Sequence, residues 1–304
     1  MVTTLSSLET EIIGVCANCT RANSQRDLRF ENWLCLIPPY QVRLCRDCGL
    51  RWLSPRPTSV GYAVVYSTEN YFGAQAGEGI AYEGMLVARN LQFESRLMQM
   101  NKYFPGRKSL NILDYGAATG EFVACARALG HHCVGVELSE DARAIAHSRF
   151  AITLYEPEGL PELSAGYDLI HMNHVFEHMP NPAAHLAWCR RMLADGGMLL
   201  IEVPQQFCNH IDGLKRLLGR GGKLEKFSAF SLHHTYFYTA RSLLDIIGRS
   251  GFQPVAITTH VIGPRLGTRK NCKSRLMDFM LRVADFAGWG GDNIELIAVK
   301  SSIE

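Results

Sequence analysis

The sequence lacks both an excess of one charge and any long apolar run. Its 304 residues carry a net charge of +2, with 47% hydrophobic and 20% charged side chains. This balance argues against a disordered chain and against a basic surface that wraps nucleic acid. No apolar stretch approaches the ~18–20 residues of a membrane span. The first fifteen residues contain two glutamates and no basic start, unlike a signal peptide. We therefore expect a folded, cytoplasmic protein.

Ten cysteines in such a chain need an explanation other than disulfides. Four of them form two CxxC pairs, Cys16 with Cys19 and Cys45 with Cys48. Two such pairs supply four thiolates to one tetrahedral zinc ion, and a site filled by sulfur would be structural. A disulfide pair or accidental spacing are the alternatives. The other six are expected to be small buried apolar side chains: Cys35, Cys125, Cys133, Cys189, Cys208 and Cys272.

Strand and helix patterns alternate along the second part of the chain. Together with the cysteine spacing, they predict a zinc-binding module over residues 1–60, an aromatic and helical connector or lid over 61–105, and an α/β domain over 106–304. Such alternation predicts a mostly parallel sheet that is covered on both faces and binds ligands beyond the carboxyl ends of its strands. The seven expected strands are 110–116, 131–138, 151–155, 167–175, 198–204, 252–261 and 293–300.

The loop after the first of these strands indicates the ligand class. Gly116 and Gly120 permit a sharp turn, and Glu137 at the end of the second strand can accept hydrogen bonds from both ribose hydroxyls. These features fit NAD and S-adenosylmethionine equally. The G-x-x-x-G spacing and Glu121 at the helix start disfavour a pyrophosphate. Asp114 can instead help to bind the cationic amino-acid end of S-adenosylmethionine. An ordinary turn beside a strand-end glutamate is the remaining alternative.

Four segments in succession then resemble the motifs of class I S-adenosylmethionine-dependent methyltransferases: LDYGAATGEF, GVELSEDARAIA, YDLIHMNHVFEHMPNP and LADGGMLLIEVP. The resemblance implies a Rossmann-like sheet. Ala118 departs from it, because many members have a second glycine there. The donor-binding residues that it implies are Asp114, Tyr115, Gly116, Ala117, Gly120, Glu137, Leu138, Asn173 and His174.

The N-terminal part is similar to the zinc-bearing segment of bacterial methyltransferases that act in sugar, polysaccharide and natural-product pathways. CANC and CRDCGLRWLSPRPTSVGYAVVYSTENYF carry this similarity, whereas no match to the extra C-terminal domain of the sugar enzymes follows residue 261. The implied function is methylation of a small molecule, such as a nucleotide sugar, another glycan precursor or a secondary metabolite. An RNA methyltransferase and a non-catalytic donor-binding module are the alternatives. The near-neutral charge disfavours RNA. The acceptor atom and the oligomeric state stay open.

Two histidines are the candidate catalytic residues. His178 follows the fourth expected strand, and His234 lies in an aromatic insertion that resembles the EHxxYFS segment of sugar C-methyltransferases, with His233 in place of the glutamate. A histidine titrates near neutral pH and suits the removal of a proton from the acceptor. Structural roles in a loop or in packing are the alternatives for both.

Overall fold

The computed structural model describes residues 7–65, 92–157, 166–205, 227–260, 291 and 293–301. Most of the expected connector or lid, together with Cys208 and Cys272, lies outside these residues. Among the described helices, none is both long and apolar enough to cross a membrane.

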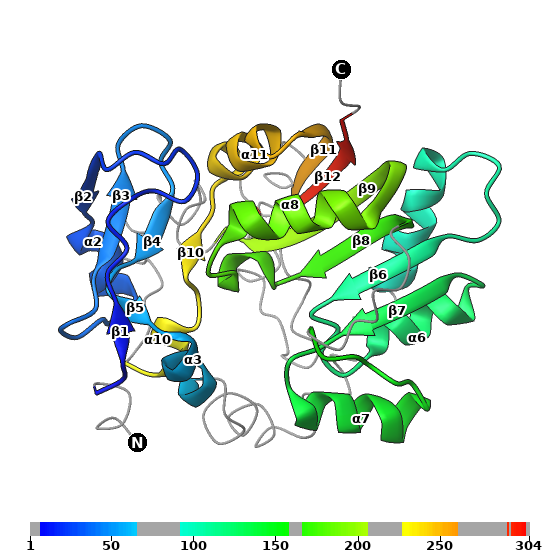
Figure 1. The fold of residues 1–304 in the computed structure, drawn as a ribbon, viewed down its shortest axis with the longest axis horizontal. Helices are drawn as coiled ribbons and strands as arrows, with labels where there is room; N and C mark the ends of the chain where they lie inside the picture. The colour runs from blue at the N-terminus through cyan, green and yellow to red at the C-terminus, as the bar shows by residue number, and fades with distance from the viewer. Residues whose placement is uncertain are drawn as a thin grey trace, which may run out of the picture.

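A six-stranded sheet is the centre of the molecule (Figure 1). Its strand order is β11-β12-β9-β8-β6-β7. β12 is antiparallel to both of its neighbours, and the other pairs are parallel, so five strands run in one direction. This confirms the predicted α/β architecture with a mostly parallel sheet. The strands are β6 (Asn111–Tyr115), β7 (His132–Val136), β8 (Tyr167–Asn173), β9 (Leu193–Pro204), β11 (Phe252–His260) and β12 (Asn293–Lys300).

The expected strand over residues 151–155 does not form a seventh strand among the described residues. Only Tyr155 pairs, in an isolated parallel bridge with Val136 on the edge strand β7. Its amide donates to Gly135, and its carbonyl accepts from Glu137. Ala151 is still the left-handed end of the preceding helix, so few residues are left to extend. Among the described residues the sheet has six strands, and the expected seventh is not confirmed.

Helices cover both faces of the sheet. α8 (Pro182–Met192) and α11 (Ala240–Arg249) pack on one face, through Leu186, Leu243 and other apolar side chains. The other face is covered by a helical stretch over 92–100, η1 (Asn101–Tyr103), α6 (Glu121–Ala128) and α7 (Glu140–Phe150). α7 begins directly after Ser139, whose hydroxyl accepts a hydrogen bond from the Ala142 amide at 3.3 Å.

The N-terminal module is built from short strands and two short helices. β2 (Ser24–Arg26), β3 (Val42–Cys45) and β4 (Arg51–Leu53) form an antiparallel sheet, and β1 (Thr10–Glu11) pairs with β5 (Arg56–Pro57). The helices are α2 (Leu28–Trp33) and α3 (Ser59–Val65).

A strand from far along the chain completes this module. β10 (Tyr236–Phe237) follows α10 (Ala229–Leu232) and pairs with β4, so it lies between the module and the large sheet in Figure 1. The side chain of Asn18 also donates to the Ser242 carbonyl of α11 at 3.3 Å. Packing thus crosses the predicted boundary after residue 60, and independent folding of the module stays a prediction.

Candidate functional site

The loop between β6 and α6 has the conformation that its glycines were expected to permit. Gly116 and Gly120 have φ angles of 81° and 83°. A Cβ atom on Gly116 would lie 2.3 Å from Cγ2 of Val175, so only glycine fits there. Ala118 is also left-handed, at φ 47°. The backbone therefore turns sharply at the carboxyl end of the first strand of the large sheet.

Glu137 is fixed beside this loop by two backbone amides. Its Oε2 accepts from Ala118 at 2.9 Å, and its Oε1 accepts from Ser139 at 2.8 Å. Burial raises the pKa of Glu137, and the backbone hydrogen bonds offset only part of that rise. Each carboxylate oxygen keeps a further lone pair for a ligand hydroxyl. Leu138, next in the chain, is 70% exposed and offers an apolar surface at the same edge.

Glu121 lies at the start of α6 and is buried. The Thr119 hydroxyl donates to its carboxylate at 2.6 Å, and an Arg149 nitrogen lies 3.5 Å from it. A carboxylate thus already occupies the region where a dinucleotide fold would place a pyrophosphate.

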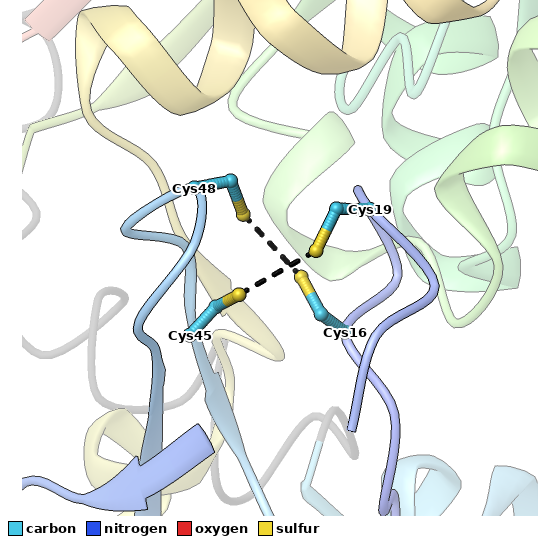
Figure 2. A group of neighbouring side chains, drawn as sticks. All are labelled: Cys16, Cys19, Cys45 and Cys48. Carbon is cyan, nitrogen blue, oxygen red and sulfur yellow. Dashed lines mark hydrogen bonds between the residues drawn. The ribbon is translucent and has the colours of Figure 1, made fainter. Parts of the chain in front are cut away.

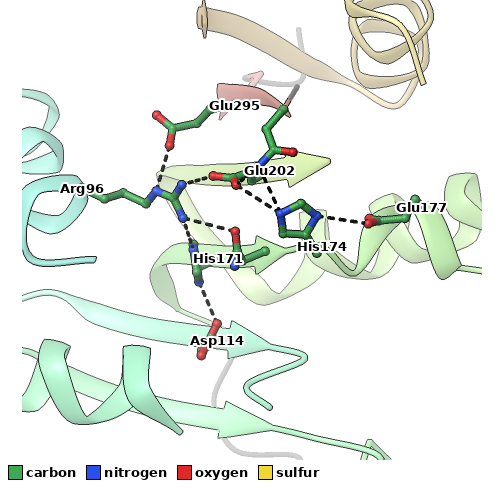
Figure 3. A network of polar contacts seen from close by, with 9 residues as sticks. Arg96, Asp114, His171, His174, Glu177, Glu202 and Glu295 are labelled. Atoms are coloured by element: carbon green, nitrogen blue, oxygen red, sulfur yellow. Dashed lines mark hydrogen bonds and ion pairs between the residues drawn. The ribbon is translucent and has the colours of Figure 1, made fainter. Parts of the chain in front are cut away.

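Asp114 belongs to a buried network at the carboxyl ends of the central strands (Figure 3). It is 2% exposed, and its Oδ1 lies 2.7 Å from Nδ1 of His171. Arg96 approaches the other ring nitrogen of His171 at 3.3 Å and Oδ1 of Asn173 at 3.4 Å. An arginine only donates, so Nε2 of His171 accepts and its Nδ1 donates to Asp114.

Two carboxylates face each other across β9 and β12 in this network. Glu202 is paired directly with Glu295, and Arg96 forms ion pairs with both side chains (Figure 3). The side chains of Arg96 and Glu202 are only 4% and 3% exposed. The guanidinium therefore neutralises a repulsion that the strand register creates.

His174 continues the network towards the next loop. It lies 3.3 Å from Glu202 and 3.5 Å from Glu177, through its two ring nitrogens. Burial alone lowers the pKa of His174, but the two neighbouring glutamates outweigh it and raise the pKa to about 9. His174 is thus a cation at neutral pH.

The two segments that contain the predicted catalytic histidines lie together. His178 belongs to η2 (Phe176–His178), and its Nδ1 is 2.6 Å from the carbonyl oxygen of His233. The rings of His178 and His234 are 5.0 Å apart between centroids. Burial, followed by the neighbouring histidines, holds the pKa of His234 well below 6.5. His234 is therefore neutral and a weaker base than a free imidazole.

The N-terminal module holds the His234 segment in place. The Leu53 amide donates to the Thr235 carbonyl at 3.0 Å, and the Thr235 amide donates to the Glu177 carbonyl at 3.1 Å. The Tyr62 and Thr235 hydroxyls are 2.7 Å apart and buried. Backbone pairing thus connects the module to both histidine segments.

The four cysteines of the CxxC pairs converge on one point (Figure 2). All are buried and none is in a disulfide. The Sγ atoms of Cys16 and Cys48 are 3.5 Å apart, as are those of Cys19 and Cys45. Thiolates at about 2.3 Å from one tetrahedral zinc ion would be roughly 3.8 Å apart. The Cys16 thiol, by hydrogen bonding, lowers the pKa of Cys48 to about 5. The site therefore fits a zinc ion.

Several residues of the site were missed by sequence reasoning. Glu202 and Glu295 could have been recognised as site candidates, because each is a charged residue between apolar neighbours in a strand. No pattern in the sequence identifies Arg96, since its partners depend on how its helix packs on the sheet. His171 and Glu177 lie inside the recognised segment, but no role was assigned to them.

The fold and the loop after β6 define the class I S-adenosylmethionine-dependent methyltransferases. The chain belongs to the methyltransferase domain family, whose sequence profile matches residues 87–257, more than half of the chain. It is 33% identical to a ubiquinone biosynthesis O-methyltransferase from Paraburkholderia xenovorans over 99 residues, which are 30% of this chain and 43% of that protein. It is 22% identical to an uncharacterized protein of Methanocaldococcus jannaschii over 190 residues, which are 62% of this chain and 84% of that protein.

Among solved structures, the plantazolicin methyltransferase in complex with SAH has a TM-score of 0.52 and 16% identity, with 79% of this chain and 93% of that chain covered. This likeness supports the fold.

Proposed function

We propose that this methyltransferase transfers the methyl group of S-adenosylmethionine to a small molecule: a sugar, a glycan precursor such as a nucleotide sugar, or a secondary metabolite. The observation that carries the proposal is the convergence of three elements at the carboxyl ends of the parallel strands. These are the Gly116–Gly120 turn, the Glu137 carboxylate and the His178–His234 pair. Ligands of open α/β sheets bind at this edge.

The donor is assigned to the loop and to the strand ends beside it. Glu137 would accept hydrogen bonds from the ribose hydroxyls, with Leu138 against the base and the backbone of residues 115–117 and 120 around the donor. Asp114, Asn173 and His174 would lie towards its methionine end. Four carboxylates of the adjoining network outnumber its two cations, Arg96 and His174, which favours a ligand that carries sulfonium and ammonium charges. The carboxylates are Asp114, Glu177, Glu202 and Glu295.

The acceptor is assigned to the side of His178 and His234, which we propose as catalytic residues. They come from the strand-end segment and from the insertion, and their rings lie 5.0 Å apart between centroids. The similar proteins act in ubiquinone biosynthesis and in plantazolicin methylation, which favours a small acceptor. The sugar assignment rests on the similarity of the N-terminal module alone.

We assign one structural zinc ion to Cys16, Cys19, Cys45 and Cys48. Four sulfur ligands leave no open position, so the ion would stabilise the module and would take no part in methyl transfer. Four free thiolates also suit a reducing, cytoplasmic compartment.

The test is transfer of a labelled methyl group from S-adenosylmethionine to nucleotide sugars, other small metabolites and RNA, offered in separate reactions. We expect label in a small molecule, with Glu137→Ala and His234→Ala much less active. Label in RNA alone would replace the proposed acceptor class, and no transfer to any acceptor by a chain that binds the donor would favour a binding module.

A further inference from the structure

Glu177 is a buried carboxylate surrounded by imidazoles. It is 1% exposed, and its Oε1 lies 3.5 Å from Nδ1 of His174, 3.7 Å from Nε2 of His178 and 3.8 Å from Nε2 of His234. An N–H···O hydrogen bond spans about 2.7–3.2 Å, so all three separations are too long. Neither carboxylate oxygen has a hydrogen-bond partner in the described part of the chain. His174 supplies a positive charge nearby, but the hydrogen-bonding capacity of both carboxylate oxygens is left for a ligand.

His178 is oriented so that it can bind a metal ion beside Glu177. Its Nδ1 lies 2.6 Å from the His233 carbonyl oxygen, which only accepts, so Nδ1 carries the proton. In the neutral ring, Nε2 then presents a lone pair near the Glu177 carboxylate. Two electron-rich atoms at 3.7 Å are stabilised by a positive ion between them. A backbone carbonyl on the far ring nitrogen is the usual way in which proteins orient a metal-binding histidine.

We propose that Glu177, His178 and His234 bind a divalent transition-metal ion. Their ligand atoms lie within 4.8 Å of one another. Bonds of about 2.1 Å to a tetrahedral ion would place neighbouring ligand atoms roughly 3.4 Å apart, a few tenths of an ångström closer than the 3.7 and 3.8 Å seen here. Small side-chain adjustments would therefore complete the site. His174 stays outside the ligand set, because its other ring nitrogen pairs with Glu202.

The ligand set indicates the kind of ion and what it would do. Two imidazoles and one carboxylate suit zinc, iron, cobalt or manganese better than calcium or magnesium. Three protein ligands leave at least one position open for water or for an oxygen of the acceptor. This last step rests on the proposed function, since it places the acceptor on the histidine side. Metal binding itself does not depend on it.

The experiment uses the full chain after its cysteine site has been filled, with one zinc per chain verified by elemental analysis. Cobalt(II) is then titrated and followed by absorption. We expect one further equivalent to bind, with ligand-field bands and without the thiolate-to-cobalt charge-transfer band that marks cysteine ligands. Glu177→Gln and His178→Gln should weaken this binding by at least about 100-fold. Glu140→Gln and His147→Gln, at exposed positions of α7, are the matched controls.

X-ray absorption of the cobalt-loaded wild type identifies nitrogen and oxygen ligands, so the test does not depend on a variant that fails to fold. The inference is overturned if wild type takes up no second ion, if the second ion shows thiolate bands, or if the ligand variants bind cobalt as wild type does. S-adenosylhomocysteine binding and methyl transfer are measured on the same samples. If wild type binds S-adenosylhomocysteine and transfers the methyl group but takes up no second ion, this inference alone fails. If wild type does neither, the proposed function fails.

Discussion

Nδ1 of His178 lies 2.6 Å from the carbonyl oxygen of His233, 55 residues further along the chain. This contact joins the loop after β8 to the insertion that contains β10, and β10 pairs with the cysteine-bearing module. The module is therefore part of the support for the candidate catalytic segment.

Replacement of Glu137 by alanine is expected to weaken S-adenosylhomocysteine binding. Loss of charge-assisted hydrogen bonds to the ribose costs on the order of 1.5–3 kcal/mol, or roughly 10- to 150-fold in Kd. Calorimetry gives the Kd directly. Glu140→Ala, at an exposed position in the first turn of α7, is the control. An unchanged affinity in Glu137→Ala would mean that the ribose lies elsewhere.

The pH dependence of donor binding should carry the signature of the same carboxylate. Burial raises the pKa of Glu137 above 4.5. Only the ionised form accepts from both ribose hydroxyls, so affinity should fall as the pH falls, beginning above 4.5. Calorimetric titrations of wild type and of Glu137→Gln are compared between pH 4.5 and 7. This range covers the titration of a carboxyl group whose pKa is raised. Identical profiles for the two proteins would exclude this role.

Removal of one zinc ligand should disturb both the module and the transfer reaction. Cys45→Ser is expected to lose the metal, to expose the region before residue 60 to proteases and to lower methyl transfer, because β4 of the module pairs with β10. Donor binding should weaken less than transfer. Cys35→Ser, outside the cysteine cluster, should keep its metal and its activity. Wild type purified without chelators and found to hold no metal would contradict the zinc assignment.

Arg96 should be important for stability. Its replacement by methionine leaves Glu202 and Glu295 facing each other without a counter-charge, which we expect to cost about 3–5 kcal/mol of unfolding free energy. Arg249→Met, which removes an exposed pair with Asp245, should cost within about 0.5 kcal/mol. Urea unfolding measures both. Equal, small effects would show that the buried network contributes little.

His234→Ala should lower kcat by roughly 10²–10⁴ on an identified acceptor, with S-adenosylhomocysteine affinity intact. His178→Ala should act mainly on the KM of the acceptor. His147→Ala serves as the control in steady-state kinetics. If both variants of the candidate histidines keep a kcat near that of wild type, transfer proceeds by alignment of donor and acceptor alone, and neither histidine is catalytic.

Local signals account for what could be predicted from the sequence. The Gly116–Gly120 turn and the position of Glu137 depend on neighbours in the chain, and both are present as expected. The expected strand over residues 151–155 is not formed in the described part of the chain. The prediction rested on only five residues at a sheet edge, where only Tyr155 pairs.

Contacts between distant segments could not be predicted in the same way. The pairing of Glu202 with Glu295 depends on the order β9-β12, which no local pattern encodes. β10 is two residues long, too short to show a period, and its partner lies in the N-terminal module. His178 is the neighbour of Glu177 in the chain, but His234 reaches Glu177 only because the Thr235 amide donates to the Glu177 carbonyl, so the cluster appears only in the folded chain.

Calorimetric titration of the purified full chain with S-adenosylhomocysteine and, separately, with NAD tests the central claim most directly. The account predicts one S-adenosylhomocysteine bound per chain, weakened in Glu137→Ala, and no measurable binding of NAD. Binding of NAD with comparable affinity, or no binding of S-adenosylhomocysteine by the folded protein, would contradict it.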